Sequence, residues 1–211
     1  MLTIFLSPKG GSGTTVIAAA HALAAAANNG RSVLVDLCGD APAVLGMAEP
    51  DAPGVNDWLA ENDTAGAADL LALGTAQGAV LVIHRGARYV NGAPRWESLL
   101  AAVGEWDFPV IVDAGTHFIP DSLRGGADRT YMVTRQCYLA LRRATRLPRA
   151  DGVVLVKEPG RVLTPKDVES VLGTGVVATV PVDPSIARAV DAGVLPQRHD
   201  ELLSACLAPI N

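Results

Sequence analysis

The stretch Ser7-Pro8-Lys9-Gly10-Gly11-Ser12-Gly13-Thr14-Thr15 decides the fold. It follows a short apolar run at the N-terminus and leads directly into an alanine-rich segment of helical length. Glycines let the backbone N–H groups of such a loop turn toward one point, and the helix that follows adds the positive end of its dipole. The stretch therefore predicts a strand, a phosphate-binding loop and a helix, although the same glycines also suit a tight turn without a ligand. The candidate phosphate-binding residues are Lys9, Gly10, Gly11, Ser12, Gly13, Thr14 and Thr15, and the Thr15 hydroxyl is a candidate Mg²⁺ ligand.

Beyond this loop, short apolar runs alternate with segments of helical length. Continuously apolar runs are typical of parallel strands that are covered on both faces. The expected strands cover residues 3–6, 33–36, 79–83, 110–113, 130–134, 153–157 and 176–180. The expected helices cover residues 14–29, 65–73, 96–105, 138–147, 164–172, 184–192 and 199–207. This alternation predicts a single α/β domain over residues 1–211, with a doubly wound, mostly parallel sheet of seven or eight strands and helices on both faces.

The composition excludes several classes of protein. Of the 211 residues, 49% are hydrophobic and 18% are charged, which excludes extended disorder, and the net charge of −5 excludes a polycation. Cys38, Cys137 and Cys206 are far apart and have no CxxC spacing, which argues against zinc, iron–sulfur clusters and disulfides. The apolar runs are too short for a signal peptide or a membrane span, so we expect a cytoplasmic protein without membrane insertion.

The loop resembles the deviant Walker A motif, K-G-G-x-G-K-[ST], of the ParA/MinD family of ATPases. Further segments resemble that family in the same order, namely 31–37, the Walker B-like strand 109–115, 127–134 and 180–193. The resemblance implies that ATP or ADP binds with Mg²⁺, with Asp113 on the metal side. It also implies that Lys9 reaches the partner's phosphates across a nucleotide-sandwich homodimer. The start of the chain and residues 139–144 look like the ATPase part of TadZ/CpaE pilus-localisation proteins.

Three positions depart from the family's pattern. Thr14 stands where the ordinary phosphate-loop lysine is expected, and Cys38 replaces the second aspartate of a D-x-D motif that positions the attacking water. Lys157 takes the place of an asparagine that reads adenine. Together the departures predict a degenerate member with little or no ATP hydrolysis, because a thiol cannot orient water at neutral pH as a carboxylate does. Asp36 and Asp40 are the carboxylates that remain as catalytic candidates.

Two other features allow more than one interpretation. Arg142, Arg146 and Arg149 recur at i, i+4 and i+7, so one helix face could present a basic stripe to DNA phosphates. A solvated helix face is the alternative. Trp58 lies in a segment that resembles the family's short helix near the dimer interface, and a plain core anchor is the alternative. The four histidines have no ligand spacing and no obvious cysteine partner.

These observations favour an intracellular positioning or partitioning protein with a degenerate nucleotide site. We expect it to act through association with a protein partner or cargo complex. One alternative is a slow ATP-dependent switch between monomer and dimer, and another is a nucleotide-independent module that binds DNA without sequence specificity.

Overall fold

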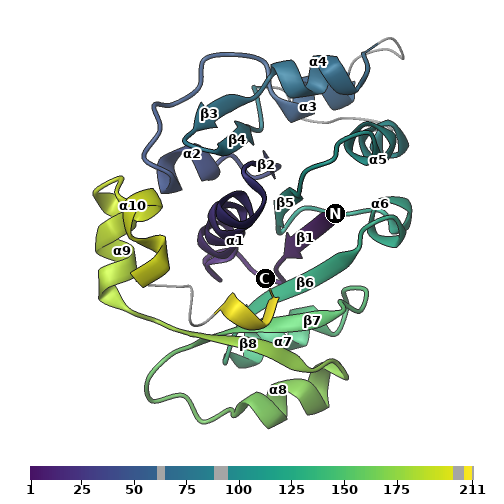
Figure 1. The fold of residues 1–211 in the computed structure, drawn as a ribbon. Coiled ribbons are helices and arrows are strands. Elements are labelled where there is room, and N and C mark those ends of the chain that lie inside the picture. The colour runs from purple at the N-terminus through teal and green to yellow at the C-terminus, as the bar shows by residue number, and fades with distance from the viewer. Residues whose placement is uncertain (61–64, 88–94, 202–206, 211) are drawn as a thin grey trace.

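The computed structural model describes residues 1–60, 65–87, 95–201 and 207–210 (Figure 1). Within these residues, eight strands form one sheet in the order β3-β4-β2-β5-β1-β6-β7-β8. The strands are β1 (Leu2–Leu6), β2 (Ser32–Asp36), β3 (Thr75–Gln77), β4 (Val80–Ile83), β5 (Val110–Gly115), β6 (Arg129–Arg135), β7 (Gly152–Lys157) and β8 (Val176–Pro181). The predicted doubly wound, mostly parallel sheet is confirmed.

The sheet is parallel except at one edge. Strand β1 lies between β5 and β6 and is parallel to both, and the other central pairs are parallel as well. Strand β3 is antiparallel to β4. The sequence analysis missed β3 because this strand is only three residues long and largely exposed, so it contains no apolar run.

Helices cover both faces of the sheet (Figure 1). On one face, apolar residues of α1 form a core cluster with β1, β2, β5, β7 and β8, and the C-terminal elements close over it. The helices of this face are α1 (Thr14–Asn29), α2 (Ala41–Val44), α9 (Pro184–Asp191) and α10 (Leu195–His199), together with a 3-10 turn at Ala208–Ile210. On the opposite face lie α3 (Val55–Ala60), α4 (Ala67–Ala72), α5 (Trp96–Gly104), α6 (Asp121–Gly125), α7 (Tyr138–Ala144) and α8 (Pro165–Leu172).

Local sequence explains where the best predicted helices begin and end. Gly13 at φ +89° precedes α1 and Gly30 at φ +81° follows it, a backbone conformation that favours glycine. At α8, the Thr164 side chain accepts a hydrogen bond from the backbone N–H of Asp167, and Pro165 occupies the first turn.

Two helix predictions differ from the structure. Helix α7 ends at Ala144 rather than at 147, because the chain turns there and Pro148 cannot continue a helix. Helix α10 (Leu195–His199) begins four residues before the helix expected over 199–207, and residues 202–206 of that prediction lie outside the described residues. The short helices α2 and α6 were not predicted, since each spans less than two turns, whereas α3 contains Trp58 and coincides with the segment that resembles the family's short helix.

The carboxyl ends of the parallel strands all lie on one side of the sheet, the carboxyl edge, where the loops after β1, β2, β5, β6 and β7 meet. Ligands of open α/β sheets bind at this edge, where the order of the strands reverses. The helices of the described residues include none long and apolar enough to cross a membrane.

Candidate functional site

The loop between β1 and α1 has the shape of a phosphate cradle. Gly11 and Gly13 have φ angles of +74° and +89°, so their conformation favours glycine. The loop is anchored at its start, where the Ser7 N–H donates to the Gly115 carbonyl at 2.6 Å. It is closed internally by the Ser12 hydroxyl, which donates to the Lys9 carbonyl at 2.7 Å. The loop is therefore held in a fixed conformation at the start of α1.

A cavity of about 540 Å³ opens over this loop. One wall is formed by the loop and the first turn of α1, from Gly10 to Val16. The opposite walls come from Cys38 and Asp40 after β2 and from Thr116 and His117 after β5. The buried Thr14 side chain lies at the first position of α1, where the uncharged hydroxyl brings no positive charge to the cavity.

Lys9 is not among the residues that line this cavity. Its ammonium donates to the Gly10 carbonyl at 3.4 Å, and its charge helps to lower the pKa of Cys137, after the larger effect of the Ala140 N–H. Lys9 therefore lies on the side of the loop that faces the start of α7 rather than over its own cradle.

Asp36 stabilises the loop that follows β2. Its Oδ1 accepts hydrogen bonds from the N–H groups of Cys38 and Gly39, both at 2.8 Å, and its Oδ2 accepts one from Ala41 at 2.9 Å. Burial raises the pKa of Asp36 against the lowering effect of these bonds. Because its carboxylate is fully buried and outside the residues that line the cavity, its geometry suits a structural role. Asp40, the other catalytic candidate, is exposed and lines the cavity.

Asp113 has a different environment at the end of β5. It is fully buried, its Oδ1 accepts a hydrogen bond from the Gly115 N–H at 3.1 Å, and its Oδ2 has no hydrogen-bond partner among the described residues. Burial raises the pKa of Asp113 to about 6, and the neighbouring Thr15 hydroxyl is the main group that lowers it. A buried carboxylate oxygen without a donor is costly unless a cation is near. Asp113 and Thr15 therefore fit a Mg²⁺ ion, which would neutralise charge on bound phosphates.

The structure brings Cys38 and His117 together, which the sequence analysis did not predict. Cys38 Sγ lies 3.8 Å from His117 Nδ1 and 3.8 Å from the Asp113 carbonyl oxygen. Burial raises the pKa of the Cys38 thiol, and the charge of Asp113 raises it further. The sulfur fits only because residue 115 is glycine, since a Cβ at Gly115 would collide with it. The expectation that no histidine has a cysteine partner is therefore wrong for His117.

An apolar cavity of about 280 Å³ adjoins the phosphate cavity. The two share Gly13, Val16 and Val190, and the apolar cavity continues along Val180 and Ile186. Its apolar walls suit a flat ring such as a nucleotide base. Lys157 is exposed at the end of β7 and is not among the residues that line it.

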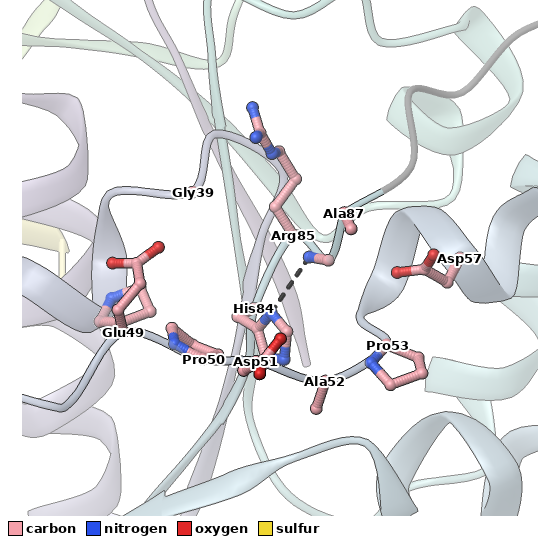
Figure 2. Close-up of a pocket in the computed structure, with 12 residues that line it drawn as sticks. Gly39, Glu49, Pro50, Asp51, Ala52, Pro53, Asp57, His84, Arg85 and Ala87 are labelled. Atoms are coloured by element: carbon pink, nitrogen blue, oxygen red, sulfur yellow. Dashed lines mark hydrogen bonds between the residues drawn. The ribbon is translucent and has the colours of Figure 1, made fainter.

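A third cavity, of about 510 Å³, lies beside Gly39 at the same edge (Figure 2). Glu49, Asp51 and Asp57 contribute acidic side chains, and Arg85 contributes a basic one. The His84 ring accepts a hydrogen bond at Nδ1 from the Gly86 N–H at 3.0 Å. Acidic groups disfavour a phosphate here, so the glycine loop is the better candidate for a nucleotide site.

The predicted arginine stripe does not form. Arg142 lies on α7, but Arg146 and Arg149 lie beyond its last residue, Ala144. The Arg149 guanidinium donates to the Gly173 carbonyl, so it contacts the turn after α8. The i, i+4, i+7 spacing describes one face only while the helix continues.

Trp58 is a core residue. It is buried on α3, and the Arg95 guanidinium stacks over its ring at 4.5 Å from the ring centroid. The core-anchor interpretation of this residue fits the structure.

No family model and no curated protein matches the sequence, but solved structures match the fold. A ParA family ATPase from Chlorobium tepidum has a TM-score of 0.79 at 19% identity, with 100% of this chain and 97% of that chain covered. A chain of the MinC:MinD cell division protein complex of Aquifex aeolicus gives a TM-score of 0.70 at 18% identity, with 99% of this chain and 92% of that chain covered. MinD from Pyrococcus horikoshii, complexed with Mg-ADP, gives 0.68 at 18% identity, also covering 99% and 92%. The chain therefore has the P-loop fold of the ParA and MinD ATPases.

Proposed function

We propose that the chain is a ParA/MinD-type positioning or partitioning protein whose nucleotide site is degenerate. It binds Mg²⁺ with ATP or ADP weakly, hydrolyses ATP little or not at all, and acts mainly by association with a protein partner or cargo complex in the cytoplasm. The fold and the glycine loop support the family. The similarity of the start of the chain to the ATPase part of TadZ/CpaE proteins supports a localisation role.

The chemistry at positions 14 and 38 carries the degenerate part of the proposal. Thr14 and Cys38 both line the phosphate cavity, at the two places where the family's pattern has a lysine and an aspartate. Loss of one charged phosphate contact costs on the order of 2–4 kcal/mol, or roughly 10²–10³-fold in rate. Loss of a group that orients water costs a further factor of roughly 10²–10⁴.

Exposed apolar side chains support association. Phe118, Tyr138 and Val162 are 79%, 74% and 93% exposed, and they follow β5, β6 and β7 at the same edge of the sheet as the phosphate loop. Large apolar side chains that form one exposed patch are typical of an interaction surface, and we propose that these three contribute to one. The fold neighbour in the MinC:MinD complex also associates with a protein, and a second copy of this chain is the other candidate partner.

Calorimetry with Mg-ATP and Mg-ADP tests the nucleotide part. Gly10→Asp places a negative charge in the cradle, where an added side chain meets nothing within 4 Å, so the fold is kept and phosphate is repelled. Gly175→Asp is the matched control, because this glycine is also exposed with open space and precedes β8 at the opposite edge. We expect weak binding by the wild type and the control and none by Gly10→Asp. Equal binding by all three would show that the ligand lies elsewhere.

Fluorescence microscopy of a tagged chain in its own cells tests the localisation part. We expect a discrete focus or pole that persists in Gly10→Asp, because association rather than hydrolysis carries the function. A uniform distribution of the wild type would contradict the proposal.

A further inference from the structure

A cluster of metal-binding donor atoms lies between the phosphate cavity and the sheet. Oxygens of Asp36 and Asp113 and the Cys38 sulfur lie within 4.8 Å of one another, and the His117 Nδ1 is 3.8 Å from that sulfur. Asp36 and Asp113 are partners in the register of β2 and β5, while Cys38 and His117 stand in the loops that follow these strands. Thiolate, imidazole and carboxylate together are a donor set for zinc rather than for magnesium.

The distance between the sulfur and imidazole donors is close to that in a tetrahedral zinc site. Zinc bonds of about 2.3 Å to sulfur and about 2.0–2.1 Å to nitrogen place the two donors about 3.6 Å apart. The observed distance between Cys38 Sγ and His117 Nδ1 is 3.8 Å. His117 is exposed, so its ring is free to turn further toward Asp113. Because His117 lies outside the group of donors within 4.8 Å of one another, its ring has to turn toward Asp113 before three ligands surround an ion.

An unpartnered buried oxygen points to a cation at this place. Asp113 is fully buried, and its Oδ2 is without a hydrogen-bond partner in the described part of the chain. The Thr15 hydroxyl already stabilises the Asp113 carboxylate, and a bound cation would stabilise this buried negative charge further. Asp36 does not compete for the ion, because three backbone N–H groups already occupy its two oxygens.

The surrounding loop holds the Cys38 sulfur in position. The Cys38 N–H is bound by Asp36 at 2.8 Å, and its carbonyl accepts a hydrogen bond from the Arg85 guanidinium at 3.5 Å. Gly115 leaves the space that the sulfur occupies. A ligand whose backbone is fixed loses less conformational freedom when it binds a metal.

We propose that Cys38, His117 and Asp113 bind a thiophilic divalent cation, Zn²⁺, at the wall of the phosphate cavity. Cys38 binds as the thiolate, and its proton is released to the solvent. The fourth position faces the cavity, because Cys38 and His117 both line it. The inference goes beyond the proposed function, since the metal binds without any nucleotide.

Titration of metal-free protein with ZnCl₂ in a calorimeter, without nucleotide, tests the proposal. All variants carry Cys206→Ser, since Cys206 lies outside the described residues. We expect one Zn²⁺ per chain, with an affinity that falls at least about 100-fold in Cys38→Ser and at least about 10-fold in His117→Ala. Co²⁺ serves as a spectroscopic probe, because a cobalt–thiolate bond gives a charge-transfer absorption that Cys38→Ser must remove.

Cys137→Ser is the matched control, since Cys137 is the other described cysteine and is bonded to no member of the cluster. It is expected to bind Zn²⁺ as the wild type does, and circular dichroism checks that each variant is folded. Equal affinity of Cys38→Ser and Cys137→Ser, or no Zn²⁺ binding by the wild type, would overturn the proposal. Either result leaves the nucleotide calorimetry unaffected, so failure of this proposal is distinguishable from failure of the proposed function.

Discussion

Asp36 on β2 and Asp113 on β5 are register partners on neighbouring parallel strands, and both carboxyl groups are fully buried. The two carboxyl groups differ in their hydrogen-bond partners, and this difference indicates different roles. The Asp36 oxygens are occupied by three backbone N–H groups, whereas one Asp113 oxygen is without a partner among the described residues. Asp36 therefore shapes the loop that carries Cys38, and Asp113 is the carboxylate available to a metal.

Replacement of Asp36 tests whether this residue stabilises the loop that follows β2. Asp36→Ala leaves three buried or half-buried N–H groups without an acceptor, and we expect the free energy of unfolding to fall by about 2–4 kcal/mol. Asp36→Asn keeps one carbonyl oxygen as an acceptor and is expected to lose less. Urea unfolding of the three proteins measures the difference. An Asp36→Ala variant as stable as the wild type would refute the structural role.

The close approach of Gly115 and Cys38 predicts that substitutions at these two positions have coupled effects on the free energy of unfolding. Gly115→Ala is expected to destabilise the fold by about 1–3 kcal/mol, because its φ of +48° is strained for alanine and the new Cβ collides with the Cys38 sulfur. Gly78→Ala has a similar φ of +60° with nothing within 4 Å, so it measures the backbone strain alone.

Removal of the Cys38 sulfur separates the steric collision at position 115 from the backbone strain of the positive φ. Cys38→Ala combined with Gly115→Ala is expected to recover the stability that Gly115→Ala loses beyond Gly78→Ala. Thermal unfolding of the single and double variants gives the coupling. Additive losses would mean that the two side chains do not meet.

The two described cysteines are expected to differ in their reaction with iodoacetamide. The pKa of Cys137 is lowered first by the N–H groups of Ala140 and Leu139 and then by the charges of Lys9 and Arg161. Burial instead raises the pKa of Cys38. A lower pKa means more thiolate, so at about pH 7.5 Cys137 reacts and Cys38 does not. Lys9→Ala removes a positive charge and slows the reaction of Cys137. Mass spectrometry of peptides in a Cys206→Ser background follows both sites, and faster alkylation of Cys38 would contradict the expected order.

Association is expected to be independent of nucleotide. Thr14 brings no charge to the phosphates, so we expect the same sedimentation coefficient with and without Mg-ATP. If the apolar side chains at the carboxyl edge form the contact, Phe118→Glu with Val162→Glu weakens it. Val171→Glu is the control, because this exposed valine lies on α8, away from that edge. A shift to dimer that requires ATP would favour the alternative of a nucleotide switch.

Much of the fold could be predicted from the sequence because it depends on local patterns. The glycine loop marks the junction of β1 and α1, and continuous apolar runs mark the buried parallel strands. The proximity of Cys38 and His117, 79 residues apart, could not be predicted in this way. It requires β2 and β5 to be neighbours in the sheet, and the order of strands is not encoded in local periodicity. The one available signal was that each residue stands shortly after a strand end.

The arginine spacing failed for a related reason. Periodicity shows which residues would share a helix face, but it does not show where the helix stops. Helix α7 ends at Ala144, and Arg146 and Arg149 follow the turn. Pro148 was the signal in the sequence for an early end.

Steady-state phosphate release tests the degenerate site most directly. The four proteins to compare are the wild type, Thr14→Lys, Cys38→Asp and the double variant, with Lys9→Ala as the control. Thr14→Lys is expected to restore nucleotide affinity but little turnover, and Cys38→Asp alone to do nothing measurable, because the substrate is held weakly. Only the double variant is expected to regain slow hydrolysis. We predict that the wild type releases phosphate no faster than background, and wild-type turnover that disappears in Lys9→Ala would contradict the account.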